Sequence, residues 1–360
     1  MRPLMIFTLL VLGLLLTLDS ALAQDWGLGA TGQQESRLIL ERSAPLTVAV
    51  IDTGTDLTHP SLKGRAWRNP GEIGLDQNGR DKSSNGLDDD ANGFIDDVSG
   101  WNFAGNNSDL SDHHGHGTHI TGIINSVSPG VKFMVLKYFD PRARGQDNLK
   151  ALIAAIHYAT RMNADIINYS GGGFVPSIHE KFAIQEAARK GILFVAAAGN
   201  ESSNSDIRPF YPADYRLSNI LSVGAHNQKS DLLPQSNYGL HSVQIAAPGD
   251  AILSTLPKGA WGPMSGTSQA TAFATGAACL LKTQRPDFSA AEVIGHLRNT
   301  ALFEHRLTGK IASSGRLNIR RALASQERGR SVSGYRLANR LALRNEAAPK
   351  SRLAAQTPLQ

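Results

Sequence analysis

Alternating β-branched runs and helical stretches, from about position 131 onward, restrict the folds open to this 360-residue chain more than any other feature. Short apolar runs suited to buried strands are separated by helical patterns of roughly ten to fifteen residues, which is typical of βαβ units. We therefore expect a three-layer, doubly wound α/β domain with a mostly parallel sheet and right-handed crossovers. The expected strands cover residues 46–51, 132–138, 166–169, 193–198 and 220–224, and the expected helices cover 149–160, 181–190, 272–282 and 289–298.

The start of the chain has the pattern of a secretory signal peptide. Met1-Arg2 precedes an apolar run from Leu4 to Leu18, and Ala21-Leu22-Ala23 supplies small residues for cleavage,. We expect a signal peptide over residues 1–23 and an exported protein, secreted or periplasmic. A retained anchor is the alternative, although the run is short for a membrane span.

The end of the chain differs in composition from the rest. One large domain over residues 24–325 is followed by residues 326–360, which are rich in arginine, alanine and serine. We interpret this basic tail as loosely ordered, with weak contact with a membrane or cell surface as the alternative. The net charge of +5 comes without a nucleic-acid-binding motif, so we expect no nucleic-acid partner,. We also expect the protein to be a monomer.

Cys279 is the single cysteine, and its neighbours are apolar. An intrachain disulfide is therefore ruled out for this sequence. A small buried core residue is the expected role, because a free cysteine in apolar surroundings packs like a small hydrophobe.

An acidic loop insertion is expected over residues 76–112, where glycine, asparagine and aspartate replace periodic patterns,. Its centre alternates oxygen donors around a glycine turn, as calcium loops do, although no glutamate closes it as in an EF-hand. Structural calcium is one interpretation and a solvated acidic loop is the other. The candidate ligands are Asp88, Asp90, Asn92, the Phe94 carbonyl, Asp96 and Asp97, and the choice between the last two is open.

Chemistry is indicated by the stretch from Gly266 to Thr271, where Ser268 lies in a glycine- and threonine-flanked turn before an apolar helical run. A serine hydroxyl needs a base and an acid that orients the base. Asp52 ends a buried strand, which is where open α/β sheets place their sites. His116 lies in a glycine-punctuated stretch that runs into a helix.

The histidine-rich stretch of residues 113–119 also raises the question of zinc. His116 and His119 are three apart, without a nearby carboxylate at zinc-site spacing or a cysteine partner, so zinc is disfavoured,. We expect His119 to pack inside its helix and His59, before Pro60, to lie in a surface turn.

Several blocks together resemble the subtilisin-like serine proteases, or subtilases. They are Val48-Ala49-Val50-Ile51-Asp52-Thr53-Gly54, Gly115-His116-Gly117-Thr118-His119, Ala197-Ala198-Gly199-Asn200, Ala246-Ala247-Pro248-Gly249 and Ser265-Gly266-Thr267-Ser268-Gln269-Ala270-Thr271. Their order, acid then histidine then serine, is the subtilisin order. The resemblance covers residues 25–324 and implies a subtilisin-like fold.

The resemblance implies a serine endopeptidase that cleaves protein or peptide substrates through an acyl-enzyme. Asp52, His116 and Ser268 would form the triad, and Asn200 would stabilise the oxyanion. Substrate would lie as an added strand between two segments, one with Ser170, Gly171 and Gly172 and the other with Arg144 and Gly145. A catalytically silent binding protein and a calcium-dependent adhesion module are the alternative functions.

Departures from the subtilase pattern bear on specificity. Subtilases usually have Met, Pro and His where this chain has Gln269, Ala272 and Phe273. Phe210 stands where the family often has a small residue at the floor of the specificity pocket, so we expect a shallow pocket that favours small or medium side chains. The resemblance also suggests a cis bond before Pro212.

Overall fold

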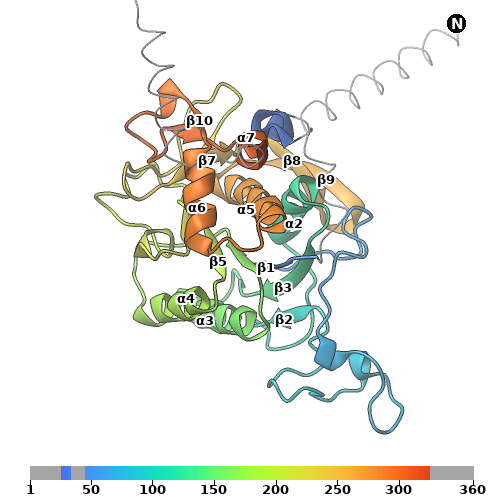
Figure 1. Cartoon of the computed structure of the whole chain (residues 1–360). Coiled ribbons are helices and arrows are strands. Elements are labelled where there is room, and N and C mark those ends of the chain that lie inside the picture. Colours follow the sequence, from blue (N-terminus) through green and yellow to red (C-terminus); the bar gives the residue numbers. More distant parts are fainter. Residues whose placement is uncertain (1–25, 34–44, 325–360) are drawn as a thin grey trace, which may run out of the picture.

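The structure is a computed structural model that describes residues 26–33 and 45–324 (Figure 1). The expected signal peptide, residues 1–23, and the basic tail, residues 326–360, lie outside the described residues. In the described part of the chain, no helix combines the length and the apolar character needed to cross a membrane.

A nine-stranded sheet forms the middle layer, in the order β10-β11-β7-β6-β5-β4-β1-β3-β2. Every neighbouring pair is parallel except β10 with β11. The doubly wound α/β architecture expected from the sequence is therefore confirmed. The strands are β1 (Thr47–Asp52), β2 (Gly100–Asn102), β3 (Lys132–Lys137), β4 (Ile166–Tyr169), β5 (Leu193–Ala197), β6 (Ile220–His226), β7 (Ile245–Pro248), β10 (Leu302–Phe303) and β11 (Gly315–Arg316).

Both faces of the central strands are buried, which explains why their sequences are apolar throughout rather than alternating. In β1, Val48 and Val50 pack into the core on one side of the sheet, whereas Ala49 and Ile51 pack into the core on the other. Helices cover both sides, with α3 and α4 on one face and α2 and α5 on the other (Figure 1). The helices are α2 (His116–Val127), α3 (Gly145–Arg161), α4 (Ile178–Arg189), α5 (Thr267–Gln284), α6 (Ala290–Asn299) and α7 (Ile319–Ala324).

Helix α5 is buried over most of its length and contacts strands β4 to β7. A helix whose side chains are apolar or small on all sides is suited to the interior of a large domain. Cys279 lies in its buried part, as expected, and burial raises the pKa of the thiol. This central helix carries Ser268 at its N-terminal end, next to the edge of the sheet.

Several boundaries differ from the sequence expectation, including the start of α5, which lies at Thr267 rather than at 272. Helix α3 begins at Gly145 rather than at 149, and α4 begins at Ile178 because the Ser177 hydroxyl accepts a hydrogen bond from the Glu180 N–H and caps it,. The expected loop over residues 76–112 contains strand β2, which pairs with β3 at the sheet edge. Three residues are too few to show a strand periodicity.

Parallel register brings the carboxyl ends of the central strands together. Asp52 at the end of β1 lies opposite Lys137 at the end of β3, and Ile51 lies opposite Tyr169 at the end of β4. The β8 (Ile252–Leu256) and β9 (Ala260–Met264) hairpin packs beside α2. Asp52, His116 and the segment after β4 therefore meet at one edge of the sheet.

Candidate active site

An acid–histidine pair lies at this edge. The Asp52 Oδ1 atom is 2.7 Å from the Nδ1 atom of His116, and it also accepts a hydrogen bond of 2.8 Å from the Thr53 N–H. Because a carboxylate only accepts, Nδ1 of His116 carries the proton, and Nε2 of the neutral ring is an acceptor. A Cβ atom on Gly117 would collide with the Gly54 carbonyl, so glycine lets the start of α2 approach the end of β1.

The charge of Asp52 changes the proton affinity of His116. Burial opposes protonation of the ring, but the charge and hydrogen bond of Asp52, with a contribution from Asp112, outweigh burial and raise the pKa of His116 above 6.5. The buried His119, in contrast, has its pKa lowered to about 4 by burial. His119 Nε2 lies 3.0 Å from the carbonyl oxygens of Ile252 and Gly262, so its expected role in packing is confirmed.

His59 departs from the sequence expectation. Instead of lying in a surface turn, it is buried, with its Nε2 atom 3.1 Å from the Ala260 carbonyl and its ring edge-on to Trp261. The β8–β9 hairpin covers this histidine. Because the covering residues lie about 200 positions later in the chain, the sequence near His59 gives no sign that it is buried.

Ser268 lies in the first turn of α5, after Gly266, whose φ of 151° is a conformation that favours glycine,. Its hydroxyl donates a 3.1 Å hydrogen bond to the Ser170 carbonyl, and the Ser170 hydroxyl donates to the Ser268 carbonyl at 3.3 Å. Ser170, Asp52 and His116 line one cavity of about 150 Å³. The structure thus brings the serine next to the cavity that the acid–histidine pair lines.

Asn200 is oriented by the start of the same helix. Its Oδ1 atom accepts hydrogen bonds from the Thr267 N–H at 2.9 Å and from the Thr267 hydroxyl at 3.1 Å. The side-chain oxygen is therefore engaged, and the amide NH₂ is the group presented to the site. This assignment of oxygen and nitrogen rests on the hydrogen-bond network.

The expected specificity segment contains a buried aromatic ring. Phe210 is 5% exposed and contacts the positions that side chains on Gly172 and Gly199 would occupy. Its N–H donates to the Asp214 carboxylate at 2.7 Å, and the ring of Phe174 packs edge-on against it. The bond before Pro212 is cis, as expected.

The expected substrate segments lie as follows. Ser170, Gly171 and Gly172 follow β4, and side chains on Gly171 would contact the hydroxyls of Tyr138 and Tyr169. Arg144 precedes α3 and pairs with Asp147 at 3.0 Å, while Gly145 begins the helix and is exposed.

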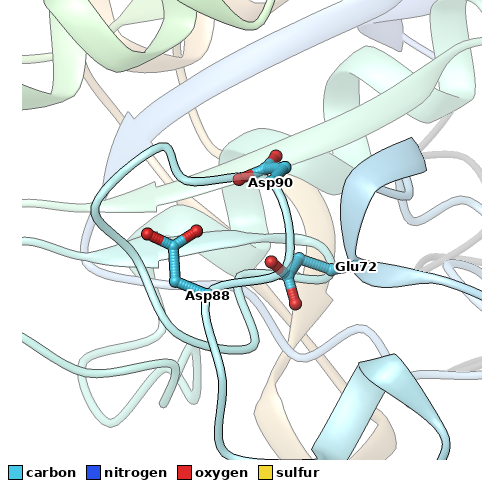
Figure 2. Close-up of side chains that lie close together, drawn as sticks. All are labelled: Glu72, Asp88 and Asp90. Atoms are coloured by element: carbon cyan, nitrogen blue, oxygen red, sulfur yellow. The ribbon is translucent and has the colours of Figure 1, made fainter. Parts of the chain in front are cut away.

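Three carboxylates converge in the acidic segment. Figure 2 shows Glu72, from the short 3-10 helix Pro70–Glu72, close to Asp88 and Asp90 of the following loop. One oxygen of each lies within 4.8 Å of the others. Glu72 is buried, its Oε1 atom accepts from the Asp89 N–H at 2.9 Å, and its buried Oε2 atom has no hydrogen-bond partner. Burial and the neighbouring carboxylates raise the pKa of Glu72 to about 7.

The other candidate calcium ligands have different surroundings. Asp97 is buried, and its oxygens accept from the side chains of Asn69, Asn92 and Tyr158. Asp96 accepts from the Gly86 N–H at 3.2 Å, and Asn92 Oδ1 accepts from the Phe94 N–H at 2.8 Å. The convergence therefore involves Asp88 and Asp90 of the predicted set, together with Glu72, which the sequence pattern missed because it precedes the loop.

Asp112 is a second residue that the sequence interpretation left without a role. It is buried between Thr53, which follows Asp52, and the start of α2. Its carboxylate accepts a hydrogen bond from the Thr118 N–H in the first turn of α2, although Gly115 is the N-cap residue. An acid a few residues before a helix start is the local signal that could have indicated this contact.

Comparisons with known proteins agree with this arrangement. The Subtilase family profile matches residues 44–331. Subtilisin amylosacchariticus from Bacillus subtilis subsp. amylosacchariticus is 36% identical over 268 residues, covering 71% of this chain and 60% of that protein. The chain thus spans less than two thirds of that relative's length.

Solved structures share the fold. A cold adapted subtilisin-like serine proteinase is 25% identical, with a TM-score of 0.59 over 81% of this chain and 96% of that one. A lanthipeptide protease, at 23% identity, has a TM-score of 0.66 over 84% of this chain and 94% of that one, a likeness of fold alone.

Fold and site together define an α/β protein that holds an acid–histidine pair and a helix-borne serine at one edge of a parallel sheet. The chain belongs to the Subtilase family.

The two histidines of α2 are expected to titrate far apart. The imidazole of His116 should gain its proton with a midpoint above pH 6.5, because the charge of Asp52 favours the protonated ring,. His119 should stay neutral down to about pH 4, because it is buried. NMR titration of the ring protons measures both, with His116→Gln and His119→Gln used for assignment. A midpoint for His116 below 6.5 would contradict the expected role of Asp52.

Proposed function

We propose that the protein is a serine endopeptidase that hydrolyses peptide bonds of extended polypeptides through an acyl-enzyme. The observation that carries this proposal is the 2.7 Å contact between Asp52 and His116 at a cavity beside Ser268. The match of residues 44–331 to the Subtilase family supports the same reaction.

Ser268 would attack the peptide carbonyl while Nε2 of His116 removes the hydroxyl proton. His116 would then return this proton to the leaving amine. In the second half of the reaction, water would attack the acyl-enzyme while His116 takes a proton from the water, and His116 would return that proton to the Ser268 oxygen. Asp52 keeps the proton on Nδ1, so Nε2 is available as the base, and its charge stabilises the imidazolium,. The hydroxyl turns from the Ser170 carbonyl toward His116 in this step.

The oxyanion would bind between the Asn200 amide and the Ser268 N–H. Thr267 fixes the oxygen of the Asn200 side chain, so the amide donor is held in place before substrate arrives. The N–H groups in the first turn of a helix lack partners within the helix, and they favour negative charge. Loss of one such oxyanion donor typically lowers kcat by about 10²–10³.

Substrate would bind as an extended strand along Ser170 to Gly172, with Arg144 and Gly145 on its other side. Gly171 and Gly172 have no side chains, so a substrate backbone can come close to them. Backbone pairing of this kind recognises extended chains with little regard for sequence.

A fluorophosphonate probe tests the proposed reaction, because only an activated serine reacts with it. We expect the full-length protein to be labelled, and Ser268→Ala and His116→Ala to lose labelling. Ser265→Ala, in the same loop, is the matched control and should retain it. Measuring the melting temperature of each variant separates loss of reactivity from loss of folding.

The same experiment distinguishes the alternatives. A catalytically silent binding protein of this fold, or an adhesion module that uses the acidic loop and the basic tail, would leave the probe unreacted in wild type. Labelling that persists in Ser268→Ala would exclude this serine as the nucleophile.

Phe210 would limit the size of the substrate side chain that precedes the scissile bond. Its ring lies against Gly172, which belongs to an expected substrate segment, and against Gly199, which precedes Asn200. We expect cleavage after small and medium side chains to exceed cleavage after phenylalanine in a peptide library, and Phe210→Ala to shift the preference toward large side chains. Phe182→Ala, at an exposed ring on α4, is the control. Equal cleavage by wild type after alanine and phenylalanine would refute the proposal.

Glu72, Asp88 and Asp90 fit a structural calcium ion. The unpartnered Oε2 atom of Glu72 and two loop carboxylates offer the hard oxygen ligands that calcium prefers,. A cation here would offset the repulsion among the three charges and would link the helix Pro70–Glu72 to the loop. The main contribution of this ion would be to stability, because none of the three carboxylates lines the cavity beside Asp52 and His116.

Calcium should therefore raise the melting temperature, and a chelator should lower it. We expect Glu72→Gln to reduce this calcium-dependent shift, because it removes a buried ligand charge. Asp81→Asn removes an exposed carboxylate of the same segment outside the cluster and should keep the full shift. Differential scanning fluorimetry measures the shifts. Identical melting curves with calcium and with chelator would overturn the calcium site.

Export of the protein, with the signal peptide over residues 1–23, is the setting we propose for this reaction. For the tail over residues 326–360, weak contact with an anionic membrane or cell surface through its arginines stays the alternative interpretation,. A peptidase domain over residues 24–325, acting as a monomer on protein or peptide substrates, completes the proposed organisation.

A further inference from the structure

Asp112 connects the loop before α2 to the first turn of that helix. Its Oδ2 atom accepts from the N–H and the hydroxyl of Thr118 at 2.9 and 2.7 Å. Its Oδ1 atom accepts from the N–H groups of His114 and Gly115 at 3.0 and 2.8 Å. Because His116 lies between these donors in the chain, one carboxylate holds the backbone on both sides of the histidine.

The same carboxylate reaches the strand that carries Asp52. The Thr53 hydroxyl donates to Asp112 Oδ1 at 2.9 Å and accepts from the Gly117 N–H at 3.0 Å. Thr53 follows Asp52, and Gly117 follows His116. A single hydroxyl bonded to Asp112 thus joins the two chain segments that meet at the acid–histidine pair.

Asp112 is 5% exposed, and its five hydrogen-bond donors are neutral groups. Burial favours the protonated carboxyl, but these donors outweigh burial and lower the pKa of Asp112, so it stays ionised,. The charge of Asp112 is one of the causes that raise the pKa of the neighbouring His116.

We infer that Asp112 is a positioning residue for the proposed peptidase reaction. It holds the backbone on both sides of His116, together with Thr53, so that the imidazole stays against Asp52. This inference rests on the proposed function. Asp112 acts through His116 and Thr53 and does not contact the reacting atoms.

The other titratable groups around His116 contribute differently. Asp52 from β1 and Asp112 from the loop are the carboxylates that raise the pKa of His116. His119 is buried and neutral above about pH 4, His114 lies edge-on with ring centroids 6.2 Å apart, and Tyr138 lines the same cavity with its pKa raised by burial. Removing the Asp112 charge should therefore lower the pKa of His116.

The test compares Asp112→Asn with wild type in kcat and KM across pH, using a chromogenic peptide ester and the full-length protein. We expect kcat to fall by about 10- to 100-fold with little change in KM, as for a misplaced catalytic group. The acid limb of kcat/KM should move to lower pH, because His116 loses its proton more readily. Asp109→Asn removes an exposed carboxylate of the same loop. This control should leave kcat and the acid limb of kcat/KM unchanged.

A second pair of variants decides the matter if Asp112→Asn does not fold. Thr53→Val removes the bridging hydroxyl with little change in shape, and Thr53→Ser keeps it. We expect Thr53→Val to lower kcat and Thr53→Ser to restore most of it. Equal kcat in the two variants, or a wild-type kcat and acid limb in Asp112→Asn, would overturn the inference. Wild type that fails to react with a fluorophosphonate would instead refute the proposed function itself.

Discussion

Parallel pairing of β1 with β3 and β4 is the constraint on which the rest of the structure depends. Strands that run in one direction end at one edge, so Asp52 and the segment after Tyr169 lie side by side although more than 100 positions separate them. Burial of both faces requires helices on each side, and two of those helices, α2 and α5, begin at the same edge. The site is thus a consequence of strand direction.

Three of the buried carboxylates, Asp52, Asp112 and Glu72, differ in the donors that surround them. Asp52 and Asp112 are surrounded by N–H and hydroxyl donors, which keep a charge stable in a poorly solvated place,. Glu72 has a backbone donor on one oxygen and nothing on the other, with two further carboxylates close by. The first arrangement suits a permanent negative charge beside a histidine, and the second suits a bound cation.

Errors in the sequence interpretation share one cause, since they concern contacts between distant segments. His59 was expected at the surface, but a hairpin about 200 positions later covers it. Glu72 precedes the acidic loop and joins its carboxylates only when the chain turns back. The partners of Asp97 are likewise distant in sequence, since Tyr158 on α3 and Asn69 donate hydrogen bonds to its oxygens; its role as a candidate calcium ligand stays a prediction.

Sequence alone determined the fold class and the family, and it singled out Asp52, His116 and Ser268 as candidates, because buried strands and glycine-rich turns leave local patterns. The cap of α6, where Ser289 and Glu292 bond each other's backbone, is likewise a short local pattern. Tertiary structure decided what surrounds those groups: the pairing of Asp52 with His116 at 2.7 Å, the five donors to Asp112 and the cluster at Glu72. Hydrogen bonds and charges act over a few ångströms in space, and only the folded chain brings such distant positions within that range.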